Sequence, residues 1–131
     1  MKKLLAVSLF CLLPGCAIID SFLMKYDPNE YAMITDIRTF ANASVDSCGT
    51  DNAAKNADVL SLKTTQFANY TEYLPHNEPT KKSAVELNAM AQGLSKQYQT
   101  SKVSPAFCKI KFAGVAASAE VIQKIVGAKP R

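Results

Sequence analysis

Apolar residues recur at intervals of three and four in four successive segments, and this pattern restricts the fold more than any other feature of the chain. Such intervals place side chains on one face of an α-helix. The first segment follows Asp27-Pro28-Asn29-Glu30, which predicts an N-cap, a proline at the first helical position and a capping-box acid. Gly49 predicts its end. Its apolar face comprises Ile34, Ile37, Ala41, Val45 and Cys48.

The second and third segments are also expected to be helices. Thr50 or Asp51 caps the second, which ends at Leu74-Pro75 and whose threonines lower its helix propensity. Its weaker face comprises Val59, Lys63, Phe67, Tyr70 and Leu74. The third begins near Thr80, with Ser83-Ala84-Val85-Glu86 as a capping box. Its face comprises Ala84, Leu87, Ala91, Leu94 and Tyr98.

A fourth helix is predicted near the end of the chain. Ser104-Pro105 supplies an N-cap and a first helical residue, and Gly127 and Pro130 end the helix. Its stripe comprises Cys108, Phe112, Val115, Ala119, Ile122 and Val126. Four amphipathic helices joined by short turns predict an all-α domain over residues 28–131, a small up-down-up-down four-helix bundle.

The start of the chain has a different character. Met1-Lys2-Lys3 precedes an apolar run from residue 4 to residue 13, which is too short to span a bilayer, and Leu13-Pro14-Gly15-Cys16 follows. This string resembles the signal of bacterial lipoproteins, in which the lipobox cysteine becomes the acylated N-terminus. Pro14 departs from the small or hydroxyl residue usual at that position.

The resemblance implies that residues 1–15 are removed and that Cys16 is lipidated. Because Ala17 follows the cysteine where an Asp would resemble an inner-membrane retention signal, it also implies the periplasmic face of the outer membrane. The alternative is an ordinary secretory leader, cleaved elsewhere, which leaves Cys16 a plain thiol. Both interpretations place the mature chain outside the cytoplasm.

Once the leader is set aside, with Cys11 in it and Cys16 acylated, two cysteines remain. Cys48 and Cys108 would lie together in an oxidising compartment, where two thiols most often form a disulfide. In the expected bundle the end of the first helix and the start of the fourth are neighbours at one end, and the two cysteines occupy those places. We therefore expect a Cys48–Cys108 bridge, the alternative being two buried free thiols.

The segment between Cys16 and the first helix is a short apolar tether, residues 16–27. Fully extended, such a segment reaches only about 35 Å, so the bundle is expected to stay close to the membrane. Its apolar side chains either enter the membrane interface or pack on the bundle. They are Ile18, Ile19, Phe22 and Leu23.

Several function classes lack the residues they need. The net charge of +4 includes two leader lysines, and there is no Trp and no arginine cluster that would indicate a nucleic-acid site. His76 is the only histidine and no Cys-x-x-Cys occurs, so we expect no metal and no cofactor. Alanine-rich helix faces argue against a small-molecule cavity. Without a nucleophile elbow or a phosphate loop, an enzyme is not expected.

Two features could mark a protein-binding surface. Tyr70, Tyr73 and Tyr98 could form an exposed aromatic patch, although core tyrosines with outward hydroxyls are the simpler interpretation. The uncharged stretch from Phe112 to Ala119, with Gly114 at its centre, could form a groove for a partner helix or could pack closely inside the bundle.

These expectations favour a non-enzymatic, membrane-anchored lipoprotein that binds another envelope protein through a helical face. In its lipobox, helix count and cysteine placement the chain is similar to the pilotin lipoproteins of type II secretion. Those are disulfide-stapled helical bundles that bind a secretin tail, but the similarity carries no site residues. The alternatives are a phage- or plasmid-encoded exclusion lipoprotein that occludes a receptor, and a purely structural envelope lipoprotein.

Overall fold

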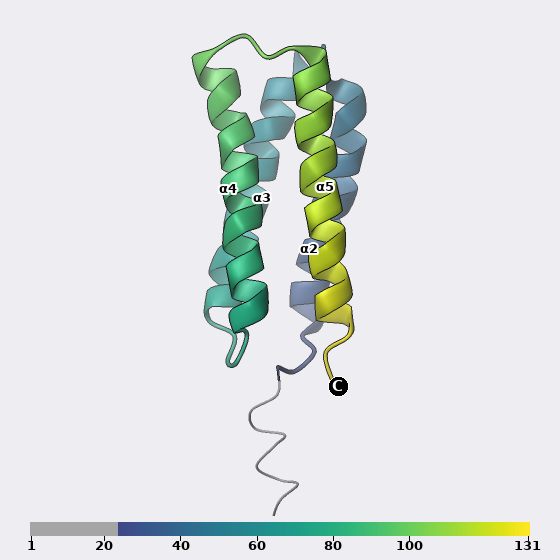
Figure 1. Ribbon diagram of the computed structural model, residues 1–131, viewed down its shortest axis with the longest axis vertical. Helices are drawn as coiled ribbons and strands as arrows, with labels where there is room; N and C mark the ends of the chain where they lie inside the picture. The colour runs from purple at the N-terminus through teal and green to yellow at the C-terminus, as the bar shows by residue number, and fades with distance from the viewer. Residues whose placement is uncertain (1–23) are drawn as a thin grey trace, which may run out of the picture.

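A computed structural model describes residues 24–131, which form the four-helix bundle shown in Figure 1. The described part consists of α2 (Pro28–Ser44), a short 3-10 helix η1 (Val45–Ser47), α3 (Asn52–Glu72), α4 (Glu78–Thr100) and α5 (Pro105–Gly127). The predictions made for the leader, for Cys16 and for the tether residues Ile18, Ile19, Phe22 and Leu23 lie outside the described residues.

Successive helices run antiparallel, so the predicted all-α, up-down-up-down bundle is confirmed. The closest packing is between α3 and α4 and between α2 and α5. In Figure 1, α4 and α5 form the face turned toward the viewer, and α2 and α3 lie behind them. The start of α2, the α3–α4 turn and the C-terminus share one end of the bundle.

Two of the predicted helix starts are confirmed by their caps. The Asp27 carboxylate accepts a hydrogen bond from the Glu30 amide at 2.8 Å, and Pro28 is the first residue of α2. The Ser104 hydroxyl accepts one from the Phe107 amide at 3.2 Å. Each cap satisfies an amide that the helix itself leaves unpaired, which fixes where the helix begins.

The core includes most of the apolar faces predicted for α2, α4 and α5, while Val45, Cys48 and Tyr98 of those faces are only partly buried against it. Each helix buries one stripe inside the bundle, with apolar side chains that are 0–4% exposed. On α2 and α4 the buried apolar residues are Ile34, Ile37, Ala41, Ala84, Leu87, Ala91 and Leu94. On α5 they are Cys108, Phe112, Val115, Ala116, Ala119, Ile122 and Val126.

The face predicted for α3 was wrong in all but one position. Only Phe67 of the predicted stripe is buried, whereas Lys63 forms an ion pair with Asp36 at 2.6 Å. Two core positions are threonines: Thr64 donates to the Leu60 carbonyl at 3.1 Å, and Thr71 donates to the Ala68 carbonyl at 2.9 Å. These bonds satisfy the hydroxyls inside the helix, so the threonines are buried as apolar residues would be. The buried residues of α3 are Ala53, Ala57, Leu60, Thr64, Phe67 and Thr71.

Helix α4 begins slightly before the predicted start near Thr80, and the predicted capping box is absent. The helix begins at Glu78, with Asn77 in the N-cap position and Pro79 in the first turn. Ser83, expected to cap the helix, instead donates to the Pro79 carbonyl at 3.1 Å. Pro79 is compatible with the first turn because its missing amide proton would be unpaired there in any case.

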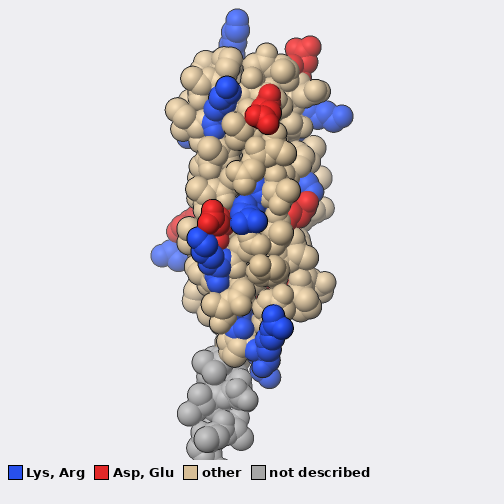
Figure 2. Space-filling view, turned by 90° about the vertical axis from the view of Figure 1, so that its right-hand side faces the viewer, with Lys and Arg blue, Asp and Glu red and all other residues tan. Residues whose placement is uncertain are grey.

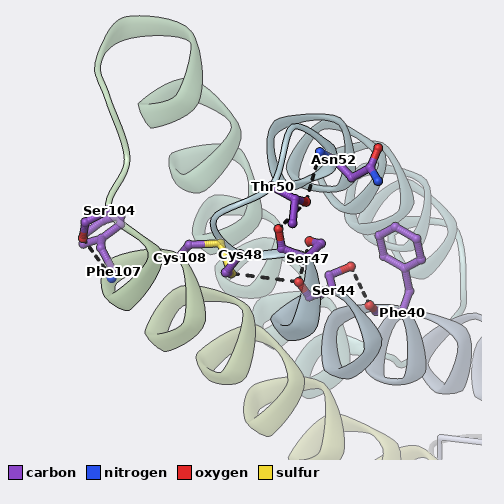
Figure 3. The surroundings of a disulfide bond; sticks show 9 residues. All are labelled: Phe40, Ser44, Ser47, Cys48, Thr50, Asn52, Ser104, Phe107 and Cys108. Carbon is purple, nitrogen blue, oxygen red and sulfur yellow. Dashed lines mark hydrogen bonds between the residues drawn. A yellow bond between two sulfur atoms is a disulfide. The ribbon is translucent and has the colours of Figure 1, made fainter.

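The predicted disulfide is confirmed. Cys48 lies directly after η1 and Cys108 lies in the first turn of α5, and their Cα atoms are 5.7 Å apart (Figure 3). Cys108 is fully buried, and Cys48 packs against the core. At the end of α2, Ser44 donates to the Phe40 carbonyl at 2.8 Å. The bridge therefore joins the two ends that topology brings together, the last residues of the α2–η1 segment and the start of α5.

Candidate functional site

Helix α5 carries a second apolar stripe, on the side opposite its core stripe. Ile110 is 70% exposed and Val121 is 59% exposed. No charged residue occurs between Phe112 and Ala119. The charged residues of α5 are Lys109, Lys111, Glu120 and Lys124, so the helix is not apolar on all sides, yet its outer stripe is largely exposed while its inner stripe is buried. We call this stripe the α5 outer face; it comprises Phe107, Ile110, Gly114, Ala117, Val121 and Ile125.

A hollow of about 220 Å³ lies beside the α5 outer face, between α4 and α5. The exposed Met90 side chain stands over it, and the Ser118 hydroxyl donates to the Met90 sulfur at 3.6 Å. The lining residues are Ser83, Glu86, Leu87, Met90, Ser118, Val121 and Ile122. The hollow and the α5 outer face together form what we call the α4–α5 face.

Two glycines leave space on the α4–α5 side of the bundle. A Cβ atom added to Gly93 would meet nothing within 4 Å, and one added to Gly114 would meet the Met90 Cε at 3.6 Å, an ordinary contact. Glycine inside a helix destabilises it by roughly 0.5–1 kcal/mol relative to alanine. Because the bundle's own packing does not require Gly93, the fold alone does not account for it. Both positions would let another backbone approach closely.

The sequence left open whether the residues from Phe112 to Ala119 pack inside the bundle or form part of an outer groove. The structure buries some of them and exposes others. Phe112, Val115 and Ala119 pack in the core. Gly114 is partly exposed and Ala117 is exposed, both on the α5 outer face. This stretch therefore packs closely inside the bundle and also presents an uncharged surface outside it. Figure 2 shows the side of the bundle that contains α2 and α5, where small groups of charged side chains of both signs lie on a mostly uncharged surface.

The three tyrosines do not form one patch. Tyr70 and Tyr73 lie at the end of α3 and Tyr98 at the end of α4, and these ends are at opposite ends of the bundle. The Tyr70 hydroxyl donates to both carboxylate oxygens of Asp27 at 3.1 Å. Tyr98 packs against the core, and burial raises the pKa of its phenol. Tyr73, 87% exposed, is the one of the three with a free ring surface.

A buried polar cluster closes the end of the bundle where the N- and C-terminal segments meet. Glu30 and the Lys129 side chain are almost completely buried, and the Lys129 ammonium donates to the Glu30 carboxylate at 2.5 Å. Asn77 donates to the second Glu30 oxygen at 2.7 Å and accepts from Lys129 at 2.6 Å. Glu30 was expected to close a capping box. Its carboxylate instead ties α2 to the α3–α4 turn and to the tail after α5.

The same end contains a larger hollow, of about 420 Å³, between the residues that precede α2 and the α3–α4 turn. Its polar groups are partly engaged, because Asp27 accepts from the Tyr70 hydroxyl and caps α2. Its lining comprises Lys25, Tyr26, Asp27, Leu74, Pro75, His76 and Asn77. Among residues 24–131, no three His, Cys, Asp or Glu side chains gather as a metal site would require.

Comparison with known proteins gives no family assignment: no protein-family model matches the chain, and no curated protein or solved structure matches it. Among the helices that the structure describes, none is long and apolar enough to cross a membrane. We take the α4–α5 face as the candidate site because it combines exposed apolar residues with a hollow. Its sequence signal is the second stripe of α5, visible as apolar or small residues at positions 107, 110, 114, 117, 121 and 125.

Proposed function

We propose that this chain is a non-enzymatic lipoprotein of the bacterial cell envelope. Acylated Cys16 anchors it to the outer membrane, and the α4–α5 face binds another envelope protein, as in a pilotin-like adaptor. The exposed apolar stripe on α5 carries the binding half of the proposal, because contiguous exposed apolar surface rimmed by polar residues typically marks an interaction site. The lipobox-like sequence at Leu13-Pro14-Gly15-Cys16 carries the anchoring half.

The two halves fit together geometrically. The described chain begins at Met24, at the end of the bundle that also holds the C-terminus (Figure 1). A segment from Cys16 to Met24 spans at most about 30 Å when extended, so an anchored Cys16 would keep that end of the bundle near the bilayer. The long side of the bundle, including the α4–α5 face, would then extend from the membrane into the periplasm, within reach of a partner.

Replacement of the acylation site tests the anchor. Cys16→Ser removes the thiol that the acyl chains would occupy, and since several acyl chains hold a protein stably in a bilayer, we expect the variant to leave the membrane fraction for the soluble periplasm. Cell fractionation with immunoblotting measures this redistribution. Retention of the variant in the outer membrane at the level of the unmodified chain would refute the lipobox assignment.

Substitutions on the α4–α5 face test the binding half. Changing both Ile110 and Val121 to Gln removes exposed apolar surface without adding charge, and we expect at least a tenfold loss of the partner recovered when the chain is affinity-purified from membranes. Leu62→Gln is the matched control, because Leu62 on α3 is as exposed as Val121, at 59%. Equal recovery with all three chains would contradict the proposal.

One alternative shares this surface and one does not. A phage- or plasmid-encoded exclusion lipoprotein would use the same face to occlude a receptor, so the identity of the recovered partner separates that role from an adaptor. A purely structural envelope lipoprotein should have uniformly polar outer faces, and the exposed Ile110 and Val121 count against it.

A further inference from the structure

We infer that the end of the bundle nearest the anchor is a membrane-contact surface, which meets the headgroup layer of the bilayer through the turn between α3 and α4. This inference rests on the proposed lipid anchor and adds that the folded domain itself touches lipid, in one orientation. It follows from where the chain enters the bundle, from the uncharged turn, and from the hollow beside that turn. We call this surface the bundle tip; it comprises Lys25, Tyr26, Asp27, Tyr73, Leu74, Pro75 and His76.

The described chain enters the bundle at this end. It begins at Met24, and the start of α2, the α3–α4 turn and the C-terminus lie together there (Figure 1). Met24 follows Cys16 by eight residues, which span at most about 30 Å. The opposite end of the bundle lies a helix length away, about 34 Å for the 23 residues of α5. A bilayer that held the acylated Cys16 would therefore lie nearest to the bundle tip.

The α3–α4 turn presents an uncharged and partly aromatic surface. Residues 73–77 are Tyr-Leu-Pro-His-Asn, which carry no charge with the histidine neutral. The Tyr73 side chain is 87% exposed, and Pro75 is exposed as well. A single exposed aromatic residue is ordinary on a protein surface. Beside a membrane anchor its position matters, because tyrosine concentrates where hydrocarbon meets headgroups, with its ring in the apolar layer and its hydroxyl in the polar one.

The hollow of about 420 Å³ opens beside this turn. Leu74 and Pro75 line it on one side and Tyr26 on the other, and its volume suits a lipid headgroup or the first carbons of an acyl chain. Asp27 also lines the hollow, but its carboxylate already accepts hydrogen bonds from the Glu30 amide and the Tyr70 hydroxyl. Lipid entering here would cover apolar surface that the bundle leaves open.

Contacts between remote segments hold the bundle tip in shape. The Tyr26 amide donates to the Pro130 carbonyl at 2.8 Å, and the Arg131 guanidinium lies 5.1 Å from the centre of the Tyr26 ring. On the other side of the hollow, the Asn77 amide donates to the buried Glu30 carboxylate at 2.7 Å. Because both sides are fixed in the folded domain, the surface is formed before it meets lipid and loses little conformational entropy on contact.

Charge at this end of the bundle is close to balanced, so we assign the contact to the aromatic and apolar groups. Residues 24–30, 72–82 and 128–131 contain five basic side chains and four acidic ones, and two of the acidic ones are in ion pairs with lysines. The contact should therefore form on zwitterionic lipid as well as on anionic lipid, whereas a contact made by basic residues would need anionic lipid. The basic residues are Lys25, Lys81, Lys82, Lys129 and Arg131, and the acidic ones are Asp27, Glu30, Glu72 and Glu78.

Single tryptophan substitutions test the contact, because the chain contains no tryptophan of its own. The full-length lipidated chain carries Tyr73→Trp, Leu62→Trp or Val121→Trp and is reconstituted into phosphatidylcholine vesicles, with or without a minority of phosphatidylglycerol. Lipids brominated near the start of their acyl chains quench the fluorescence of a tryptophan that touches them. We expect the Tyr73→Trp chain to lose most of its emission in both lipid mixtures and the other two chains to keep theirs. Leu62 and Val121 are matched controls, since both are 59% exposed on the long sides of the bundle.

The outcomes separate this inference from the proposed function. If the lipidated chain floats with the vesicles in a density gradient but Tyr73→Trp is not quenched, the inference is overturned and the anchor stands. A blue-shifted but unquenched emission would mean that the chain before Met24 covers the tip, and quenching only with phosphatidylglycerol would assign the contact to basic residues; each overturns the inference. Quenching of Val121→Trp would mean that α5 lies on the membrane, which contradicts both the inference and partner binding by the α4–α5 face. A lipidated chain that does not float overturns the anchor and the inference together.

Discussion

Lys129→Met is expected to lower the free energy of unfolding by about 3–5 kcal/mol, because it leaves the Glu30 carboxylate buried without its counter-charge. Both side chains are almost completely buried, and the ammonium supplies hydrogen bonds to Glu30 and to Asn77. A small domain has only about 5–15 kcal/mol of total stability, so the loss would be large. Urea unfolding of the Cys16→Ser chain, with and without Lys129→Met, measures it.

Two companion variants show whether the unpaired charge is the cause. Adding Glu30→Gln removes the charge while keeping a side-chain oxygen for Asn77, and we expect it to recover at least half of the lost stability. Lys124→Met breaks an exposed pair with Glu120 and should change the unfolding free energy by less than about 0.5 kcal/mol. Equal effects of Lys129→Met and Lys124→Met would refute the assigned role of the buried pair.

Removal of the disulfide is expected to lower the free energy of unfolding by about 4 kcal/mol, since the bridge restricts the unfolded chain. The bridge joins positions separated by 60 residues. The variant carries Cys48→Ala together with Cys108→Ala, because alanine fills the buried Cys108 position without adding a polar group. Urea unfolding of this variant, beside the oxidised parent, measures the difference.

Reduction provides an independent check of the disulfide effect. The parent chain in excess dithiothreitol should unfold at nearly the same urea concentration as the double alanine variant, while the variant itself should not respond to the reductant. An unchanged midpoint for the parent under reduction would mean that the bridge contributes little to stability.

The sequence predicted all four helices, and on three of them it also predicted which side is buried. On α2, α4 and α5, Ile34, Leu87 and Val115 belong to regular stripes, so periodicity identified the buried side. On α3 the rule failed because burial there is shared by alanines and threonines. Thr64 and Thr71 bond to their own helix, and no apolar count treats them as core residues.

The buried cluster could not have been predicted. Glu30 and Lys129 are 99 residues apart in sequence, and each has an ordinary surface explanation, as a helix-capping acid and as part of a polar tail. Their contact depends on how the ends of α2 and α5 come together after folding. The predicted grouping of Tyr70 with Tyr98 failed for the same reason, since only topology determines which end of the bundle each residue occupies.

The candidate surface was partly visible in the sequence. Gly114 and its uncharged neighbours indicated either close packing or a partner groove, and the structure assigns alternate residues of that stretch to the core and to the surface. Periodicity alone could not establish that the outer side of α5 has no neighbouring helix. Helix α5 packs mainly against α2 and α4, and only the folded arrangement shows which side of α5 these neighbours leave uncovered.

Photo-crosslinking in intact cells tests most directly whether the α4–α5 face binds an envelope protein. A photoreactive amino acid is placed at Val121 in one chain and at Leu62 in another, since the two positions are equally exposed on different sides of the bundle. We predict one dominant crosslinked envelope protein from position 121 and none from position 62. Absence of a crosslink at 121, or the same products from both positions, would contradict the proposed function.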